Sequence, residues 1–294
     1  MRGLIGTLTL ALVALALLGW WAGLPDLIAA WAASGQREFQ NAMAQGLRAL
    51  RAGDPGAFAA LMSVCFAYGF FHAAGPGHGK VLIGGYGLGR SVAMGRLAGI
   101  ALVSSLAQAA AAVALVYAGV LVLNLGRVAT VGLAEDIMAP VSFAAIGLIG
   151  VWLVWRGARK LWAARAVQGH HHHGEGECGE CGHAHGPTMA QVQDVHSLRD
   201  ALVLIGAIAI RPCTGALFLL ILTWQMGIWA AGIAGTFAMA LGTATITIGV
   251  AVAATGLRRG AVVSLAEGAL ARVALPAIEL SAGLLIVVVA VQMF

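Results

Sequence analysis

The stretch His72-Ala-Ala-Gly-Pro-Gly-His-Gly-Lys80 combines two imidazoles, an ammonium group and a helix-breaking unit at the end of an apolar segment. Neutral imidazole is a common ligand of nickel, cobalt, zinc and copper. Ionisable side chains are costly at membrane depth, and broken backbone is tolerated there only inside protein or beside a wet cavity. His72 and His78 are therefore predicted to bind an ion; two structural histidines at a helix end are the alternative. The break consists of Gly75, Pro76 and Gly77.

A second interrupted segment reads Arg211-Pro212-Cys213-Thr214-Gly215 within a later apolar span. Pro212 breaks the helix, and Cys213 offers a sulfur ligand. Arg211 must face protein or water, where it could hold a carboxylate or carbonyl groups, or help drive an ion off its site. Glu279 in the last span is its expected partner. A purely structural Arg211–Glu279 pair is the alternative.

The polar segment between residues 170 and 185 concentrates metal ligands. A Cys-x-x-Cys pair followed by His-x-His supplies the four ligands that a divalent transition metal needs, with a run of four histidines to spare. Interspersed glycines favour a loop that collects metal over one rigid geometry. The expected ligands are His170, His171, His172, His173, Cys178, Cys181, His183 and His185.

The composition requires a membrane to position these groups. Of the 294 residues 60% are hydrophobic and only 10% charged, and 41 are glycine. These values predict an all-α, polytopic membrane protein with closely packed helices. The net charge of +5 is interpreted as a topology signal, so nucleic acid is not an expected partner.

About seven transmembrane helices are predicted. The first is interpreted as an uncleaved span, with a cleavable signal as the alternative. Basic residues in alternating loops place the N-terminus inside and the C-terminus outside, so that residues 24–56 lie outside as an amphipathic helix. Polar residues at 104, 105, 108, 243, 245 and 247 either line a path or only bond within the bundle. The spans are 4–23, 57–74, 97–123, 138–156, 200–223, 229–254 and 272–293.

The equal spacing of two proline pairs indicates an internal repeat. Pro76 and Pro212 are separated by 212 − 76 = 136 residues, as are Pro140 and Pro276. Units of three spans must cross the membrane in opposite senses, which predicts an inverted 3+3 repeat with its binding site at the interrupted helices. Chance similarity is the alternative. The parts are an N-terminal helix and external segment (1–56), the first repeat (57–156), a cytosolic metal-binding loop (157–198) and the second repeat (199–294).

The motif from His72 to Lys80, the Pro212-Cys213 pair and the His/Cys-rich loop together resemble the NicO family of nickel/cobalt transporters. The resemblance implies a multi-pass carrier of the bacterial inner membrane, commonly an efflux system, with His72 and His78 at the metal site. Resistance exporters tend to have Pro-Cys-Pro without a preceding Arg, whereas this chain has Arg211-Pro212-Cys213-Thr214. Transport direction and choice of metal therefore stay open.

The expected function is transport of Ni²⁺ or Co²⁺ out of the cytoplasm, with Zn²⁺ as a further candidate. The loop would capture metal, His72 and His78 would receive it with help from Cys213, and protons could drive release. No tightly bound cofactor and no enzymatic activity are expected. The alternatives are a nickel or zinc importer and a membrane metal sensor that does not translocate. A periplasmic partner and a homo-oligomer both remain open.

Overall fold

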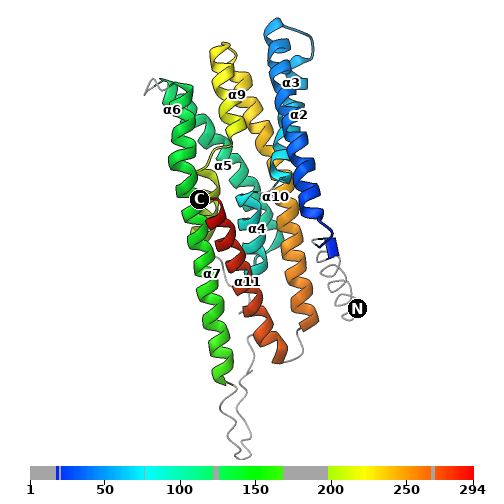
Figure 1. Ribbon diagram of the computed structural model, residues 1–294, viewed down its shortest axis with the longest axis vertical. Helices are drawn as coiled ribbons and strands as arrows, with labels where there is room; N and C mark the ends of the chain where they lie inside the picture. Colours follow the sequence, from blue (N-terminus) through cyan, green and yellow to red (C-terminus); the bar gives the residue numbers. More distant parts are fainter. Residues whose placement is uncertain (1–17, 20, 76, 122–125, 168–197, 266–268) are drawn as a thin grey trace, which may run out of the picture.

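The computed structural model describes residues 18–19, 21–75, 77–121, 126–167, 198–265 and 269–294, and these form helices and no strands (Figure 1). The all-α prediction is therefore confirmed for the described part of the chain. The elements are α2 (Leu24–Ala52), α3 (Ala57–Ala74), α4 (His78–Gly89), α5 (Met94–Leu121), α6 (Arg127–Gly132), the π-helical turn η1 (Leu133–Met138), α7 (Ala139–Val167), α8 (Leu198–Ala209), α9 (Thr214–Gln225), α10 (Trp229–Leu265) and α11 (Ala269–Gln292).

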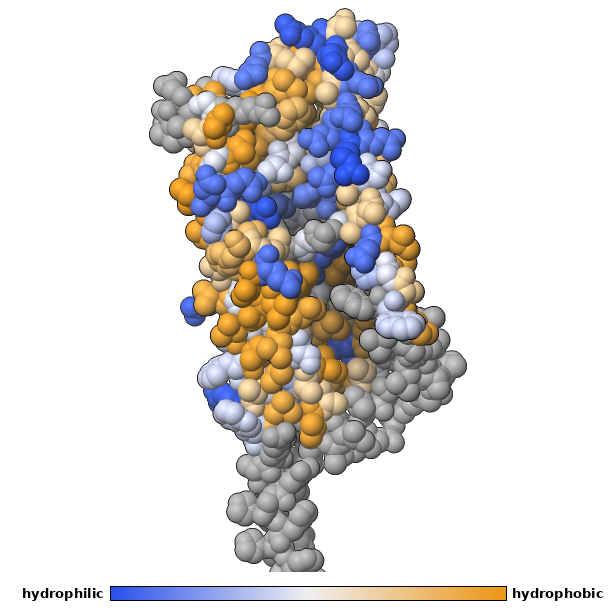
Figure 2. All heavy atoms as spheres, viewed as in Figure 1, coloured by the Kyte–Doolittle hydropathy of each residue, from blue (hydrophilic) through white to orange (hydrophobic). Residues whose placement is uncertain are grey.

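Five of these helices are long and apolar enough to cross a membrane, and the bent pair α8–α9 makes a sixth when it counts as one span. Apolar side chains cover much of the bundle's flank in Figure 2. The protein is thus a multi-pass membrane protein. The expected count of seven is not confirmed, because the span predicted at 4–23 lies largely outside the described residues. The five continuous spans are Ala57–Ala74, Met94–Val120, Val128–Ala163, Trp229–Val262 and Val273–Gln292.

The helix expected in 24–56 is present as α2, which lies along α3. Its buried stripe includes Met43 and Leu47, whereas Leu27 and Trp31 are exposed. Gly35 allows the close approach, since a methyl group there would lie 2.2 Å from the ring of Phe71. α2 therefore supports the α3 segment that carries His72.

The first interruption separates α3 from α4. α3 ends at Ala74, and α4 begins at His78 after an extended Gly77. The ammonium group of Lys80 donates to the carbonyl of Ala74 at 2.9 Å and also to that of Gly75. Lys80 thereby satisfies carbonyl groups that the end of a helix would leave without partners.

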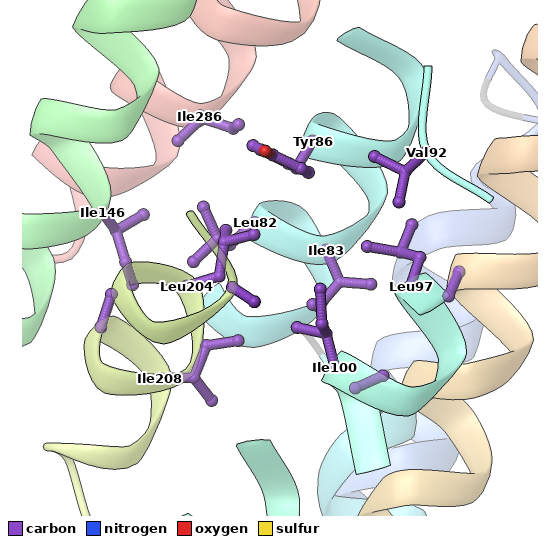
Figure 3. Close-up of a cluster of buried hydrophobic side chains, with 14 of the residues drawn as sticks. Leu82, Ile83, Tyr86, Val92, Leu97, Ile100, Ile146, Leu204, Ile208 and Ile286 are labelled. Atoms are coloured by element: carbon purple, nitrogen blue, oxygen red, sulfur yellow. The ribbon is translucent and has the colours of Figure 1, made fainter. Parts of the chain in front are cut away.

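Beyond the break, α4 is buried among other helices. Its Leu82, Ile83 and Tyr86 point into an apolar cluster with residues of α5, α8 and α11 (Figure 3). In a membrane protein such contacts stabilise the helix bundle mainly through van der Waals packing. This packing holds the short helix against the bundle.

The second interruption bends α8 and α9 by 63°. The side-chain amide of Gln108 donates to the carbonyl of Arg211 at 2.7 Å, and the Ser142 hydroxyl donates to the carbonyl of Ala207, also at 2.7 Å. Side chains of α5 and α7 thus replace the missing intrahelical bonds. In Figure 1, α9 lies at the upper end of the bundle and α4 lies below its middle, so the two short helices extend away from each other.

Candidate metal site

The two helix interruptions meet at a histidine and a cysteine. His72 lies in the last turn of α3, and Cys213 immediately precedes α9. The imidazole of His72 and the sulfur of Cys213 are hydrogen-bond partners. An imidazole nitrogen and a sulfur, both of kinds that can bind a metal, therefore lie side by side although they come from distant parts of the sequence.

The N-terminus of α9 surrounds the sulfur with donors. The backbone N–H groups of Gly215 and Ala216 donate to Sγ of Cys213. These donors, together with the positive end of the α9 dipole, suit a sulfur with negative charge. Cysteine binds metals in that form.

Tyr68 completes the surroundings of this pair. It lies one turn before His72 on α3, its ring stacks on the imidazole with a 6.0 Å centroid separation, and its hydroxyl bonds to Cys213. Gln36 of α2 donates from Nε2 to the same hydroxyl at 3.3 Å. Gly215 makes room for the ring, since a methyl group there would lie 2.3 Å from the Tyr68 oxygen.

A cavity of about 110 Å³ opens beside His72. A smaller one of about 20 Å³ reaches Cys213 and Tyr68, and both are lined by Ser105, Gln108 and Thr243. Of the polar residues expected along a path, only Thr245 lies outside, exposed and bonded back to its own helix. The other residues of the larger cavity that matter here are Lys80, Ser104, Arg211 and Thr247.

The expected pairing of Arg211 with Glu279 is wrong. Nη2 of Arg211 lies 3.5 Å from Oε2 of Glu135, and its guanidinium stands 4.9 Å from the ring centroid of Phe143. The π-helical turn η1 carries Glu135 beside the second break. Sequence patterns could not anticipate this contact, because hydropathy does not show which helix faces another.

Glu279 instead pairs with two cations of α7. Its carboxylate lies 3.1 Å from Nε of Arg156 and 2.7 Å from Nζ of Lys160. α11 packs closely along α7, since a methyl group at Gly157 would lie 2.8 Å from the Leu280 nitrogen. This contact turns Glu279, only 2% exposed, toward α7 and away from Arg211.

Several predicted ligands lie outside the described residues. They are Pro76 and the whole set His170, His171, His172, His173, Cys178, Cys181, His183 and His185. His78 is the first residue of α4, but the structure does not describe its side chain. Within the part that is described, no cluster of three or more His, Cys, Asp or Glu residues occurs. The loop site therefore stays a prediction.

Sequence reasoning missed Tyr68 and Gln36. The available signal for Tyr68 was its spacing of four residues from His72, which places both on one face of a helix. No comparable signal marks Gln36, because its role depends on how α2 packs on α3.

The fold and the site together define a class: a multi-pass helical membrane protein in which two interrupted helices meet at a half-buried His–Cys pair. Residues 58–175 match the model of the NicO family, described as "High-affinity nickel-transport protein". A Haemophilus influenzae protein named "Putative nickel/cobalt efflux system" is 29% identical over 253 residues, covering 80% of this chain and 77% of that protein. No solved structure matches the chain. The chain is thus similar to the NicO family over residues 58–175, in agreement with the resemblance of its motifs.

Proposed function

We propose that this protein carries Ni²⁺ or Co²⁺ across the inner membrane and binds the ion between His72 and Cys213. The observation that carries the proposal is the contact between these two side chains across the two helix interruptions. The NicO description and the name of the Haemophilus influenzae relative support the same class of cargo.

The chemistry of the pair suits such a cargo. Imidazole and thiolate ligands favour borderline and soft divalent ions over Mg²⁺ or Ca²⁺, which prefer oxygen. The pair leaves further coordination positions open toward the cavity. Zn²⁺ meets the same ligand preferences and stays a candidate. The ion is a substrate here, and the proposal includes neither a resident cofactor nor an enzymatic reaction.

An inverted 3+3 repeat is part of the proposal. α4 spans 78–89 and α9 spans 214–225. The two helices therefore begin 136 residues apart and end 136 residues apart, which is also the separation of Pro76 and Pro212. α3 packs against α10, and α8 packs against α5, so each interrupted span contacts the long helix of the other unit. Two such units around a central site support alternating access.

The proposed direction is efflux. The loop at 170–185 would collect metal on the cytoplasmic side, the N-terminus would be cytoplasmic, and protons competing for His72 would promote release outside. A deletion strain should then become hypersensitive to nickel or cobalt. Loss of nickel- or zinc-enzyme activity in that strain, without hypersensitivity, would support import instead.

Flux into liposomes that contain a metal-sensitive dye tests the site. Purified wild type should carry Ni²⁺, and both His72→Ala and Cys213→Ala should lower the flux about tenfold or more, because even outer-shell changes weaken metal sites by about 10–100-fold. An imposed pH gradient should change the wild-type rate. A Ni²⁺ transport rate that does not change with the pH gradient would exclude proton coupling.

Cys65→Ala is the matched control. Cys65 is fully buried, and a methyl group on Gly235 of α10 would lie 3.0 Å from its sulfur, so it packs in the core. Its removal should leave flux within about twofold of wild type, with only the modest stability loss of a small core truncation. Unchanged flux in both His72→Ala and Cys213→Ala would reject this site.

A further inference from the structure

The cavity beside His72 is rich in positive charge. Lys80 and Arg211 both line it, and no carboxylate is among its lining residues in the described part of the chain. The carboxylate of Glu135 lies 3.5 Å from Arg211 but outside the lining. These three groups carry a net charge of +1, and the Cys213 thiolate of the proposed metal site brings the total to zero before any metal ion enters. A divalent cation alone is therefore a poor match for the space.

Ser104 supplies a donor that the protein does not use. The residue is 1% exposed, lines the cavity, and its hydroxyl has no hydrogen-bond partner within the described structure. The neighbouring Ser105 differs, because its hydroxyl donates to the carbonyl of Ala101 at 3.1 Å. A buried hydroxyl without a partner is costly, so a ligand that accepts its proton would be stabilising.

The proposed metal site also lacks ligands. His72 and Cys213 contribute two, whereas a divalent transition metal takes four or more. The described residues contain no cluster of three or more His, Cys, Asp or Glu. The cationic groups of Lys80 and Arg211 cannot coordinate a metal ion, because they carry donors and no acceptor. An anion that enters with the ion can fill positions that the side chain of His78 and water leave open.

We infer that the cavity binds a small monovalent anion, a halide or a carboxylate group, which accompanies the metal ion as one of its ligands. This inference rests on the proposed function for the metal and goes beyond it in naming a second substrate. The hydroxyl of Ser104 donates to the anion, and the charges of Lys80 and Arg211 attract it. A volume of about 110 Å³ accommodates chloride or one carboxylate group.

The anion site is tested first without metal, on the purified full chain. Chloride binding broadens its NMR line, and acetate competition measures whether a carboxylate takes the same position. Wild type should show saturable broadening that Ser104→Ala and Arg211→Gln each reduce at least fivefold. Arg159→Gln is the control, because it removes one charge from an arginine that lies over Trp155 on α7, outside the cavity.

The acetate competition distinguishes a site for halide alone from a site that also accepts carboxylates. Displacement of chloride by acetate supports a shared site for halide and carboxylate, and broadening that acetate leaves intact supports halide alone. Equal broadening in wild type and Ser104→Ala, with both variants folded by circular dichroism, overturns the inference.

Metal flux then tests whether the anion travels with the ion. Wild-type Ni²⁺ flux in liposomes should fall at least threefold when chloride is replaced by methanesulfonate, a poor metal ligand, and acetate should restore it if carboxylates are accepted. Flux that ignores the anion overturns co-transport and leaves the proposed metal carrier intact. Absence of Ni²⁺ flux in every salt contradicts the proposed carrier itself. In that case the metal-free chloride measurement still shows whether the anion site exists.

Discussion

One hydroxyl group, that of Tyr68, connects the candidate site to three helices. It bonds to Cys213 at the start of α9 and accepts from Gln36 of α2, while its own ring stacks on His72 in α3. A side chain that touches a ligand without binding the metal orients that ligand, and such contacts strongly affect metal affinity. Tyr68 is therefore the expected positioning residue of the site.

Tyr68→Phe should weaken Ni²⁺ binding about tenfold, because the substitution removes the hydroxyl but keeps the stacked ring. Equilibrium binding to the purified protein, measured calorimetrically, provides the test. Gln36→Leu should have a smaller effect, since its contact to the site is indirect. Equal affinity in Tyr68→Phe and wild type would contradict a positioning role.

The carboxylate of Glu279 forms a second arrangement of charges, separate from the metal site. Glu279→Gln should lower the free energy of unfolding by about 1–3 kcal/mol, below the usual 3–5 kcal/mol for a broken buried pair, because the Lys160 side chain is 45% exposed and water screens it. Thermal unfolding in detergent measures the change. Arg159→Gln should leave the unfolding temperature nearly unchanged, and an equal drop in both variants would contradict this assignment.

Close helix packing fixes where the interrupted spans lie. Gly69 of α3 lies against Met239, and Gly242 of α10 lies against Phe66; a methyl group at either glycine would be 2.0 Å from the opposing carbonyl oxygen. Small residues at such interfaces let helix backbones approach in the bilayer. This contact positions the end of α3, and hence His72, relative to α10.

Gly242→Ala should therefore destabilise the protein by about 1–3 kcal/mol, as overpacking of a tight interface does. Gly249→Ala, seven residues further along α10, is the matched control, since no atom lies within 4 Å of the added methyl group. Unfolding temperatures of the two variants, with Ni²⁺ flux measured beside them, provide the comparison. Similar stability in both would contradict the close α3–α10 approach.

The sequence anticipated some elements and not others for physical reasons. Proline and glycine mark backbone breaks directly, so the interruptions near Pro76 and Pro212 were predictable. The span expected at 229–254 continues to Leu265, because a helix can extend past its apolar part. The Arg211–Glu279 pairing failed because it depends on which helix faces pack together, and the η1 turn beside Arg211 has no sequence signature.

At the scale of the whole molecule, alternating access requires two units that move around a shared site. The two breaks lie within the bundle while α4 and α9 extend away from each other (Figure 1). The cavity at His72 and the smaller one at Cys213 share lining residues, so the two spaces adjoin each other. The loop at 170–185 would then feed the site without forming it.

Removal of residues 170–185 should accordingly lower Ni²⁺ flux without abolishing it, most clearly at low metal concentration where capture limits the rate. Flux in liposomes across a range of Ni²⁺ concentrations measures this effect. Complete loss of metal response in the shortened protein, with its fold intact, would favour a sensor that does not translocate.

The central claim is that His72 and Cys213 bind one metal ion together. X-ray absorption spectroscopy of the nickel-loaded protein without residues 170–185, which removes the histidines and cysteines of the loop, tests it most directly. The account predicts one sulfur ligand at about 2.3 Å, close to known metal–thiolate lengths, with imidazole nitrogen in the same shell. That sulfur should disappear in Cys213→Ser, and the imidazole signal should weaken in His72→Ala. A nickel shell without sulfur, or sulfur that persists after Cys213→Ser, would contradict the account.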